Sequence, residues 1–281
     1  MNFSFIVEMQ ELMVYIIVLV VGLIFGIHFY RKSQRRSVKP FPKHWRELLN
    51  THVMYYQKLP KEKQPVFEQR MMQFLSEVYI DGVDVQIEDL DTVLIAASAV
   101  IPVFGFEEWH YSNLSGILVY PDNFNEDLQF STQDSARHIG GVVGNGRFEK
   151  QMILSKKALH HGFMNTTDKH NTGIHEFVHL IDKLDGATDG IPERLLAHQY
   201  SIPWLNLIHK EMEAINANKS DIRAYGGTKQ AEFFAVASEY FFERPDLFKR
   251  KHPELYDMMV SCFNQPFKRK EFKKNSPYQQ K

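Results

Sequence analysis

The sequence contains His175-Glu176-Phe177-Val178-His179, in which two imidazoles are separated by one helical turn and a carboxylate follows the first. On a helix, residues i and i+4 lie on the same face, so both imidazoles can bind one Zn²⁺. Glu176 lies beside them and can serve as a general base without filling a coordination position. The spacing therefore predicts a hydrolytic site with one zinc ion per chain.

The segment around this motif has the features of a buried helix. Asn171 or Thr172 can cap its start, and Gly186 can end it. The positions between and after the charged residues are apolar: Ile174, Phe177, Val178 and Ile181. An apolar flank of this kind is what a helix needs to pack against a protein core.

A hydrolytic zinc site needs three protein ligands, so a further carboxylate or histidine must lie downstream. Asp185 would require a sharp turn at Asp182, where a glycine would fit better. Glu232 is the better candidate because it opens a largely apolar helix over residues 231–242. Glu239 lies on nearly the same face, and is either a rival ligand or a group that orients a histidine.

These residues together resemble the Mlc titration factor A family of zinc peptidases, which shares its zinc-site layout with the catalytic domain of anthrax lethal factor. The resemblance covers residues 41 to 266 approximately. Its motifs are His-Glu-Phe-Val-His-Leu-Ile-Asp at 175–182, Tyr-Gly at 225–226 and Ala-Glu-Phe-Phe-Ala-Val at 231–236.

The resemblance implies a zincin-like fold and a function. His175, His179 and Glu232 would bind zinc, and Glu176 would be the base. Tyr225 would donate a hydrogen bond to the oxyanion of a peptide substrate. The family also implies aminopeptidase-like hydrolysis of short peptides. Because the family takes its title from sequestering a transcriptional repressor, the alternative is a membrane-tethered regulatory protein that binds a transcriptional regulator.

The remaining pattern predicts an α+β fold that is mainly helical, with a small sheet beside the zinc helix. Helical spacing of apolar residues appears in Trp45–Tyr56, Gln64–Tyr79, Asp89–Phe104 and Trp204–Ala217. Strand-forming residues fill Leu114–Pro121 and Lys150–Ser155. The second strand could be an edge that holds an extended substrate by main-chain pairing, or a simple interior strand.

Several other features carry weaker chemical signals. The glycine-rich stretch 140–147 lacks the Lys-Ser/Thr of a phosphate-binding loop, and its Asn145-Gly146 favours a hairpin turn. The loop 185–190 lacks the ligand set of a calcium-binding EF-hand. Cys262 falls in an apolar helix and is expected in the core. Three histidines lack an i+4 partner and are expected to be solvated or to support the site: His160, His161 and His170.

Leu12–Tyr30 is a nearly unbroken apolar run, just long enough to cross a bilayer. Acidic residues precede it and basic residues follow it, which predicts a single-pass anchor with the catalytic domain in the cytoplasm. The expected organisation is an anchor at 1–32, a linker at 33–42, a peptidase domain at 43–266 and a basic tail at 267–281. The formal net charge of −1 argues against a nucleic-acid partner.

Overall fold

The computed structural model describes residues 13, 16–17, 19–23, 38–123, 140–143, 150–165, 167–196 and 201–265. The chain divides into two compact units, Met1–Val38 and Lys39–Lys281, and the second unit holds all the elements that follow. Most of the expected anchor and the whole basic tail lie outside the described residues. Among the helices that are described, none combines the length and the apolar content needed to span a bilayer.

A four-stranded mixed sheet has the order β1-β2-β4-β3. Its strands are β1 (Tyr79–Gly82), β2 (Gly116–Tyr120), β3 (Gly141–Val143) and β4 (Gln151–Ser155). β1, β2 and β4 run parallel, whereas β3 is antiparallel to β4, with Val142 opposite Ile153. The expected strand at 150–155 is therefore confirmed, but it is interior. Reading it as an edge was wrong, because β3 occupies the edge beside it.

Twelve helical segments accompany the sheet in the described residues, and two of them are short 3-10 turns. Before α7 they are α2 (Trp45–His52), α3 (Met54–Lys58), α4 (Gln64–Glu77), α5 (Asp89–Val100) and α6 (Lys156–Met164). From α7 onward they are α7 (Thr172–Asp182), η2 (Lys183–Asp185), α8 (Ser201–Asn216), η4 (Ala224–Gly227), α9 (Gln230–Glu243), α10 (Pro245–Lys251) and α11 (Pro253–Cys262).

The expected helices are confirmed, with three corrections to their boundaries. Val53 is extended and divides the first of them into α2 and α3. The second ends at Glu77, and Tyr79 instead begins β1. The third ends at Val100 and continues as turns. These ends are set by tertiary packing, which the apolar period does not encode.

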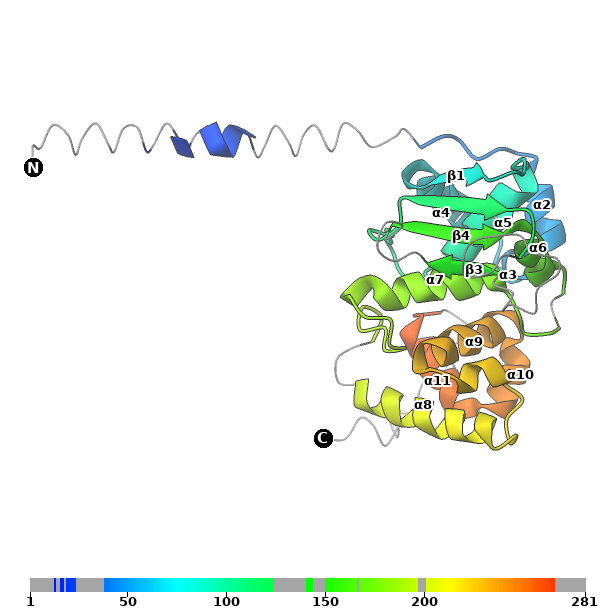
Figure 1. Ribbon diagram of the computed structural model, residues 1–281. Coiled ribbons are helices and arrows are strands. Elements are labelled where there is room, and N and C mark those ends of the chain that lie inside the picture. Colours follow the sequence, from blue (N-terminus) through cyan, green and yellow to red (C-terminus); the bar gives the residue numbers. More distant parts are fainter. Residues whose placement is uncertain are drawn as a thin grey trace, which may run out of the picture. The chain divides into compact units, whose positions relative to one another are not determined.

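 Close packing around α7 explains how the fold positions a site. Figure 1 shows α7 alongside β3, with α9 on the side of α7 away from the sheet. The ring of Phe177 on α7 packs edge-on against Phe74, with centroids 5.5 Å apart, and lies 5.3 Å from that of Tyr111. Burial of one such ring stabilises the fold by roughly 1.5–3 kcal/mol. The prediction of a mainly helical α+β fold with a small sheet is confirmed.

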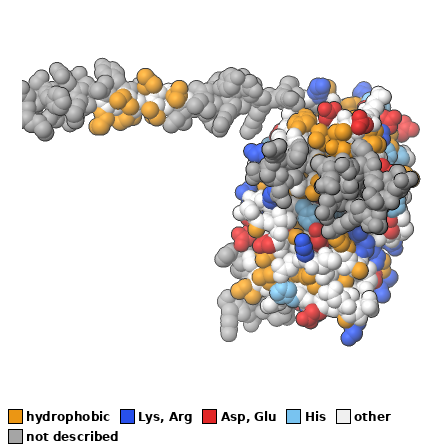
Figure 2. All heavy atoms as spheres, viewed as in Figure 1, with side chains coloured by type: hydrophobic (Ala, Val, Ile, Leu, Met, Phe, Trp, Pro, Cys, Tyr) orange, Lys and Arg blue, Asp and Glu red, His pale blue; other side chains and the backbone are white. Residues whose placement is uncertain are grey.

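The surface of the second unit carries charges of both signs. On the face shown in Figure 2, basic and acidic side chains are interspersed, and no broad field of one sign covers the described atoms. Cys262 is fully buried, as expected for a core residue. Trp109 packs against Phe106 and Tyr111, so it belongs to the aromatic scaffold.

Candidate metal centre

Helix α7 begins and ends where its sequence indicates. The side chain of Asn171 accepts a hydrogen bond from the backbone N–H of Ile174 at 3.0 Å, which caps the start. After Asp182 the chain tightens into the 3-10 turn η2 and stops at Gly186, whose φ of 107° favours glycine. The helix therefore holds His175 and His179 one turn apart on one face.

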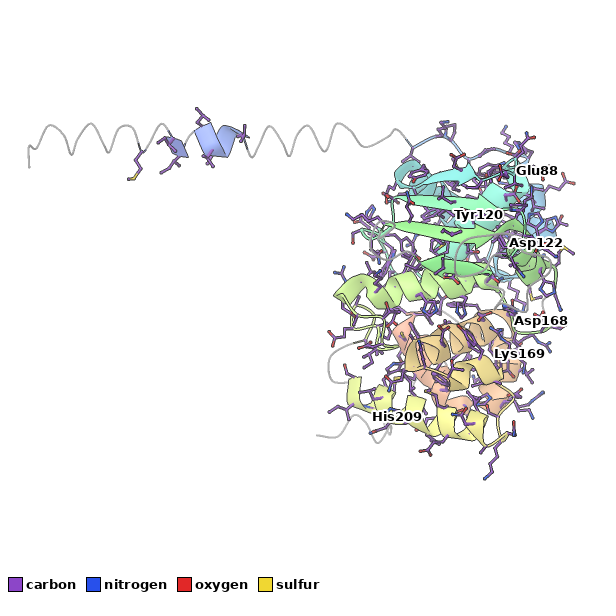
Figure 3. All side chains as sticks on the ribbon, viewed as in Figure 1. Glu88, Tyr120, Asp122, Asp168, Lys169 and His209 are labelled. Carbon is purple, nitrogen blue, oxygen red and sulfur yellow. The ribbon has the colours of Figure 1, made fainter. Side chains whose placement is uncertain are left out.

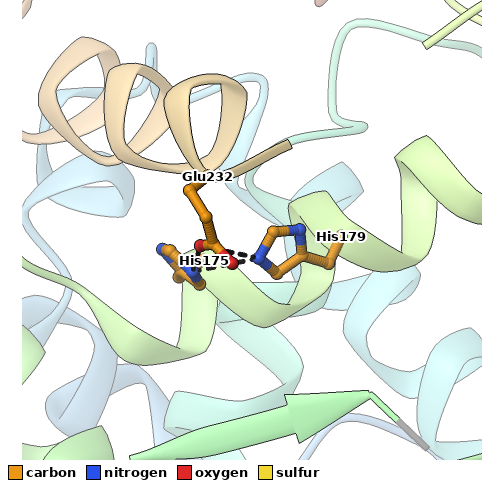
Figure 4. Close-up of side chains that lie close together, drawn as sticks. All are labelled: His175, His179 and Glu232. Carbon is orange, nitrogen blue, oxygen red and sulfur yellow. Dashed lines mark hydrogen bonds and ion pairs between the residues drawn. The ribbon is translucent and has the colours of Figure 1, made fainter. Parts of the chain in front are cut away.

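Three candidate ligand atoms converge between α7 and α9 (Figure 4). The Nε2 atoms of His175 and His179 are 3.0 Å apart. Oε2 of Glu232, in the first turn of α9, lies 3.2 Å from the former and 3.4 Å from the latter. Ligands about 2.0–2.1 Å from a tetrahedral zinc would be separated by roughly 3.3 Å. The three side chains therefore fit the size of a zinc site.

Glu239 lies behind His175 rather than among the candidate ligands. Its Oε1 accepts a hydrogen bond from Nδ1 of His175 at 2.7 Å and from Arg223 at 2.5 Å. Its Oε2 accepts from the backbone N–H of Asn171 at 2.5 Å. A carboxylate at Nδ1 fixes the imidazole tautomer and turns the Nε2 lone pair toward the site. Glu239 is thus placed to orient a ligand.

Electrostatics distinguish the groups of this cluster. Burial acts to lower the pKa of His175, but the carboxylates of Glu239 and Glu232 outweigh it and raise that pKa to about 10. Burial acts to raise the pKa of Glu232, but hydrogen bonds from the two imidazoles lower it well below its usual range. These directions describe the chain without a metal, and a bound cation would reverse the preference for protonated imidazole.

Glu176 is 5% exposed and lies against β3. A Cβ atom at Gly141 would come within 2.5 Å of its Cγ and 2.8 Å of its Oε1. The absence of a side chain at Gly141 therefore leaves the room that the glutamate occupies. Burial is the main cause that raises the pKa of Glu176, which suits a group that must accept and then release a proton.

Tyr225 approaches the site from the 3-10 turn η4. Its ring stacks on that of His175, with centroids 6.1 Å apart and an interplanar angle of 26°. It is partly buried and packs against the hydrophobic core. Tyr225 therefore lies beside the candidate ligand His175, although it comes from a different element of the fold.

The other acidic and histidine candidates serve local structure. Asp185 is exposed and accepts a hydrogen bond from the N–H of Ala187, so it does not join the cluster. Asp182 is buried and accepts from the N–H of Gly190. His160 pairs with Asp91 at 2.6 Å. His161 lies 3.8 Å from Asp168, away from α7's pair.

Sequence reasoning missed two residues that shape this centre. Arg223 pairs with Glu239, yet a lone arginine in a polar loop carries no pattern that would identify this contact. Gly141 gives Glu176 its room. Its signal was the glycine-rich stretch, which indicates a close approach of the backbone to another group.

Comparisons with known proteins agree on one family. A family model described as "Glucose-regulated metallo-peptidase M90" matches residues 28–264. An uncharacterized protein of Synechocystis is 28% identical over 79% of this chain and 83% of its own length. Mlc titration factor A of Salmonella arizonae is 28% identical over 70% of this chain and 80% of its own. The protein of the same name from Cronobacter sakazakii is 30% identical over 64% and 70%.

Proposed function

The chain belongs to the M90 metallopeptidase family, together with the Mlc titration factor A proteins, and from that premise we propose that it is a zinc-dependent peptidase. The observation that carries this proposal is the convergence of His175, His179 and Glu232 within 4.8 Å, beside a buried Glu176. Two imidazoles and one carboxylate form a ligand set of hydrolytic zinc sites, in which one position stays open for water or substrate.

In this proposal each residue has one task. Zinc held by the three ligands would supply Lewis-acid chemistry and acidify water. Glu176 accepts a proton from the attacking water and delivers it to the leaving amine. Tyr225 donates a hydrogen bond to the oxyanion that develops on the substrate carbonyl. Glu239 keeps the proton of His175 on Nδ1, so that Nε2 remains available as a ligand.

The β3 edge supports a peptide as the substrate. Gly141 brings this strand against Glu176, and β3 is paired on one side only within the described sheet. An extended peptide could add to that edge by main-chain hydrogen bonds and present its carbonyl to the base. We propose aminopeptidase-like cleavage of short peptides, as the family resemblance implies.

The second candidate function is regulatory binding with peptidase activity secondary. The name Mlc titration factor A supports it, because that name describes those relatives as titrating Mlc. Here the partner would be a transcriptional regulator.

We also propose an N-terminal membrane anchor, with the catalytic domain in the cytoplasm. Its support is the apolar sequence, with described side chains such as Leu19 and Leu23 at 70% and 61% exposure.

A Glu176→Gln variant tests the enzyme directly. It preserves size and leaves all three ligands in place, so zinc content should remain at one per chain while turnover of chromogenic short peptides falls about 10³-fold or more. Glu213→Gln, an exposed change on α8, is the matched control and should leave both quantities unchanged. If Glu176→Gln retained full turnover, Glu176 would not be the base. If the parent showed no turnover with zinc bound, the regulatory function would be favoured.

A further inference from the structure

The loop that carries Arg223 and Tyr225 is held in place at its beginning by the hydrogen bonds of Asp221. The carboxylate of Asp221 accepts hydrogen bonds from Nε2 of His252 at 2.8 Å and from the hydroxyl of Tyr240 at 2.8 Å. Nζ of Lys169 donates both to this carboxylate at 2.9 Å and to the backbone carbonyl of Asp221 at 2.7 Å. One side chain thus joins the loop to three other segments.

Lys169 connects Asp221 to α7, the helix that carries His175 and His179. It precedes Asn171, the cap of α7, by two positions and adopts a left-handed φ of 62°. Its ammonium lies 4.2 Å from the ring centroid of Tyr240. Figure 3 shows Asp168 and Lys169 at the edge of the molecule next to α9 and α10. A left-handed lysine is uncommon, and its contacts here hold it in place.

His252, between α10 and α11, has a carboxylate at each ring nitrogen. Nε2 faces Asp221, and Nδ1 lies 3.0 Å from Oε2 of Glu211 on α8. The ring also lies against those of Tyr240 on α9 and Phe248 on α10. A neutral imidazole has one donor and one acceptor, so only the imidazolium can donate to both carboxylates. The side chain is 8% exposed, so little solvent competes for these bonds.

We propose that Asp221 and His252 are positioning residues that hold the loop where Arg223 reaches Glu239 and Tyr225 reaches the metal centre, and that this hold weakens when His252 loses its proton. The consequence for turnover rests on the proposed function. The effect of His252 on the order of the loop does not depend on that function, and it can be measured without metal or substrate.

The direction of the pH effect follows from the surroundings of His252. Burial lowers its pKa, but Glu211 and Asp221 outweigh burial, so the pKa is raised above its usual 6.5. For a histidine whose pKa is higher in the folded state, the stabilisation is complete below the unfolded pKa. It is lost as pH rises through the folded pKa. The loop should therefore be held firmly at pH 6 and loosen under alkaline conditions.

Hydrogen exchange on the full chain tests this inference. The amides of Gly226 and Thr228 donate to the carbonyls of Arg223 and Tyr225 within the loop, so their protection reports on its order. In the parent, protection corrected for the intrinsic rate should fall between pH 6 and pH 9, because the imidazolium of His252 loses its proton and with it one of its two hydrogen bonds to carboxylates. The amide of His175, bonded to the carbonyl of Asn171, is the internal control.

Two variants make the result decisive. His252→Gln should lower loop protection at both pH values and remove its pH dependence. Glu211→Gln removes one carboxylate from His252, so it should move the midpoint to lower pH even if His252→Gln does not fold. Constant parent protection from pH 6 to pH 9, or an unchanged midpoint in Glu211→Gln, would overturn the proposal. A chain without turnover but with this exchange behaviour would contradict the peptidase function while supporting the loop proposal.

Discussion

Helices α7 and α9 meet at the metal centre but contribute to it in different ways. α7 carries two candidate ligands one turn apart, so their relation is fixed by helical geometry alone. α9 carries one candidate ligand, Glu232, with its side chain 19% exposed, and two turns later the fully buried Glu239. One helix therefore supplies a local motif, whereas the other supplies, through tertiary packing, a candidate ligand and the carboxylate that supports His175.

The two histidines differ accordingly. Nδ1 of His175 donates to Glu239, whereas Nδ1 of His179 is buried and has no hydrogen-bond partner among the described residues. A ligand whose second nitrogen is held by a carboxylate keeps its orientation and is a stronger base. The orientation of the candidate ligands is therefore supported mainly by Glu239 on α9.

The largest expected effect comes from removing Glu232, the candidate ligand on α9. Glu232→Ala leaves two protein ligands, so zinc content should fall well below one per chain and turnover should fall about 10³-fold or more. The fold should persist because Glu232 lies in the first turn of α9 and is partly exposed. Elemental analysis and circular dichroism measure the two quantities, with Glu213→Ala as the control. Full zinc content in Glu232→Ala would exclude it as a ligand.

A smaller effect should follow from changing the supporting carboxylate. Glu239→Gln keeps the volume but removes the charge that His175 and Arg223 face. Loss of such a partner typically weakens metal binding about 10–100-fold. Because a buried ion pair is broken, the free energy of unfolding should also fall by about 3 kcal/mol. Competition with a chelator and urea unfolding measure these changes. Unaltered zinc affinity would show that α9 contributes only Glu232.

The smallest effect on the candidate metal centre is expected for Glu243, one turn beyond Glu239. Burial, followed by the charges of Glu239 and Asp168, raises the pKa of Glu243 to about 8. Between its usual pKa of 4.5 and about 8 the folded chain binds more protons than the unfolded one, so stability falls as pH rises. Glu243→Gln should therefore be more stable than the parent by several kcal/mol at pH 9 and nearly equal at pH 4, because each unit of the shift is worth about 1.4 kcal/mol. Urea unfolding at both pH values measures this difference, and equal stability at pH 9 would contradict it.

The sequence predicted α7 well because its signals are local: a cap, an i, i+4 pair and a terminating glycine. Glu232 was predicted as the third ligand because a hydrolytic zinc site needs one and this carboxylate opens an apolar helix, and the family resemblance implies the same residue. Strand order was not predictable, because alternation identifies β4 as a strand without stating which strands flank it. The position of Glu239 remained open for a related reason. Its partners His175 and Arg223 lie 64 and 16 residues away, and no sequence period links them.

Glu239 contacts both the start of α7 and an imidazole one turn further along it, through Asn171 and His175. Glu239 therefore fixes the imidazole of His175 relative to the beginning of α7. A rotation of α7 about its axis would break both hydrogen bonds together. Glu232 lies 57 residues from His175, so an unfolded chain cannot present the same three atoms. An ion that binds only the assembled centre shifts the folding equilibrium toward the native chain by mass action. Metal supply would then govern how long the folded protein survives as well as what it can do.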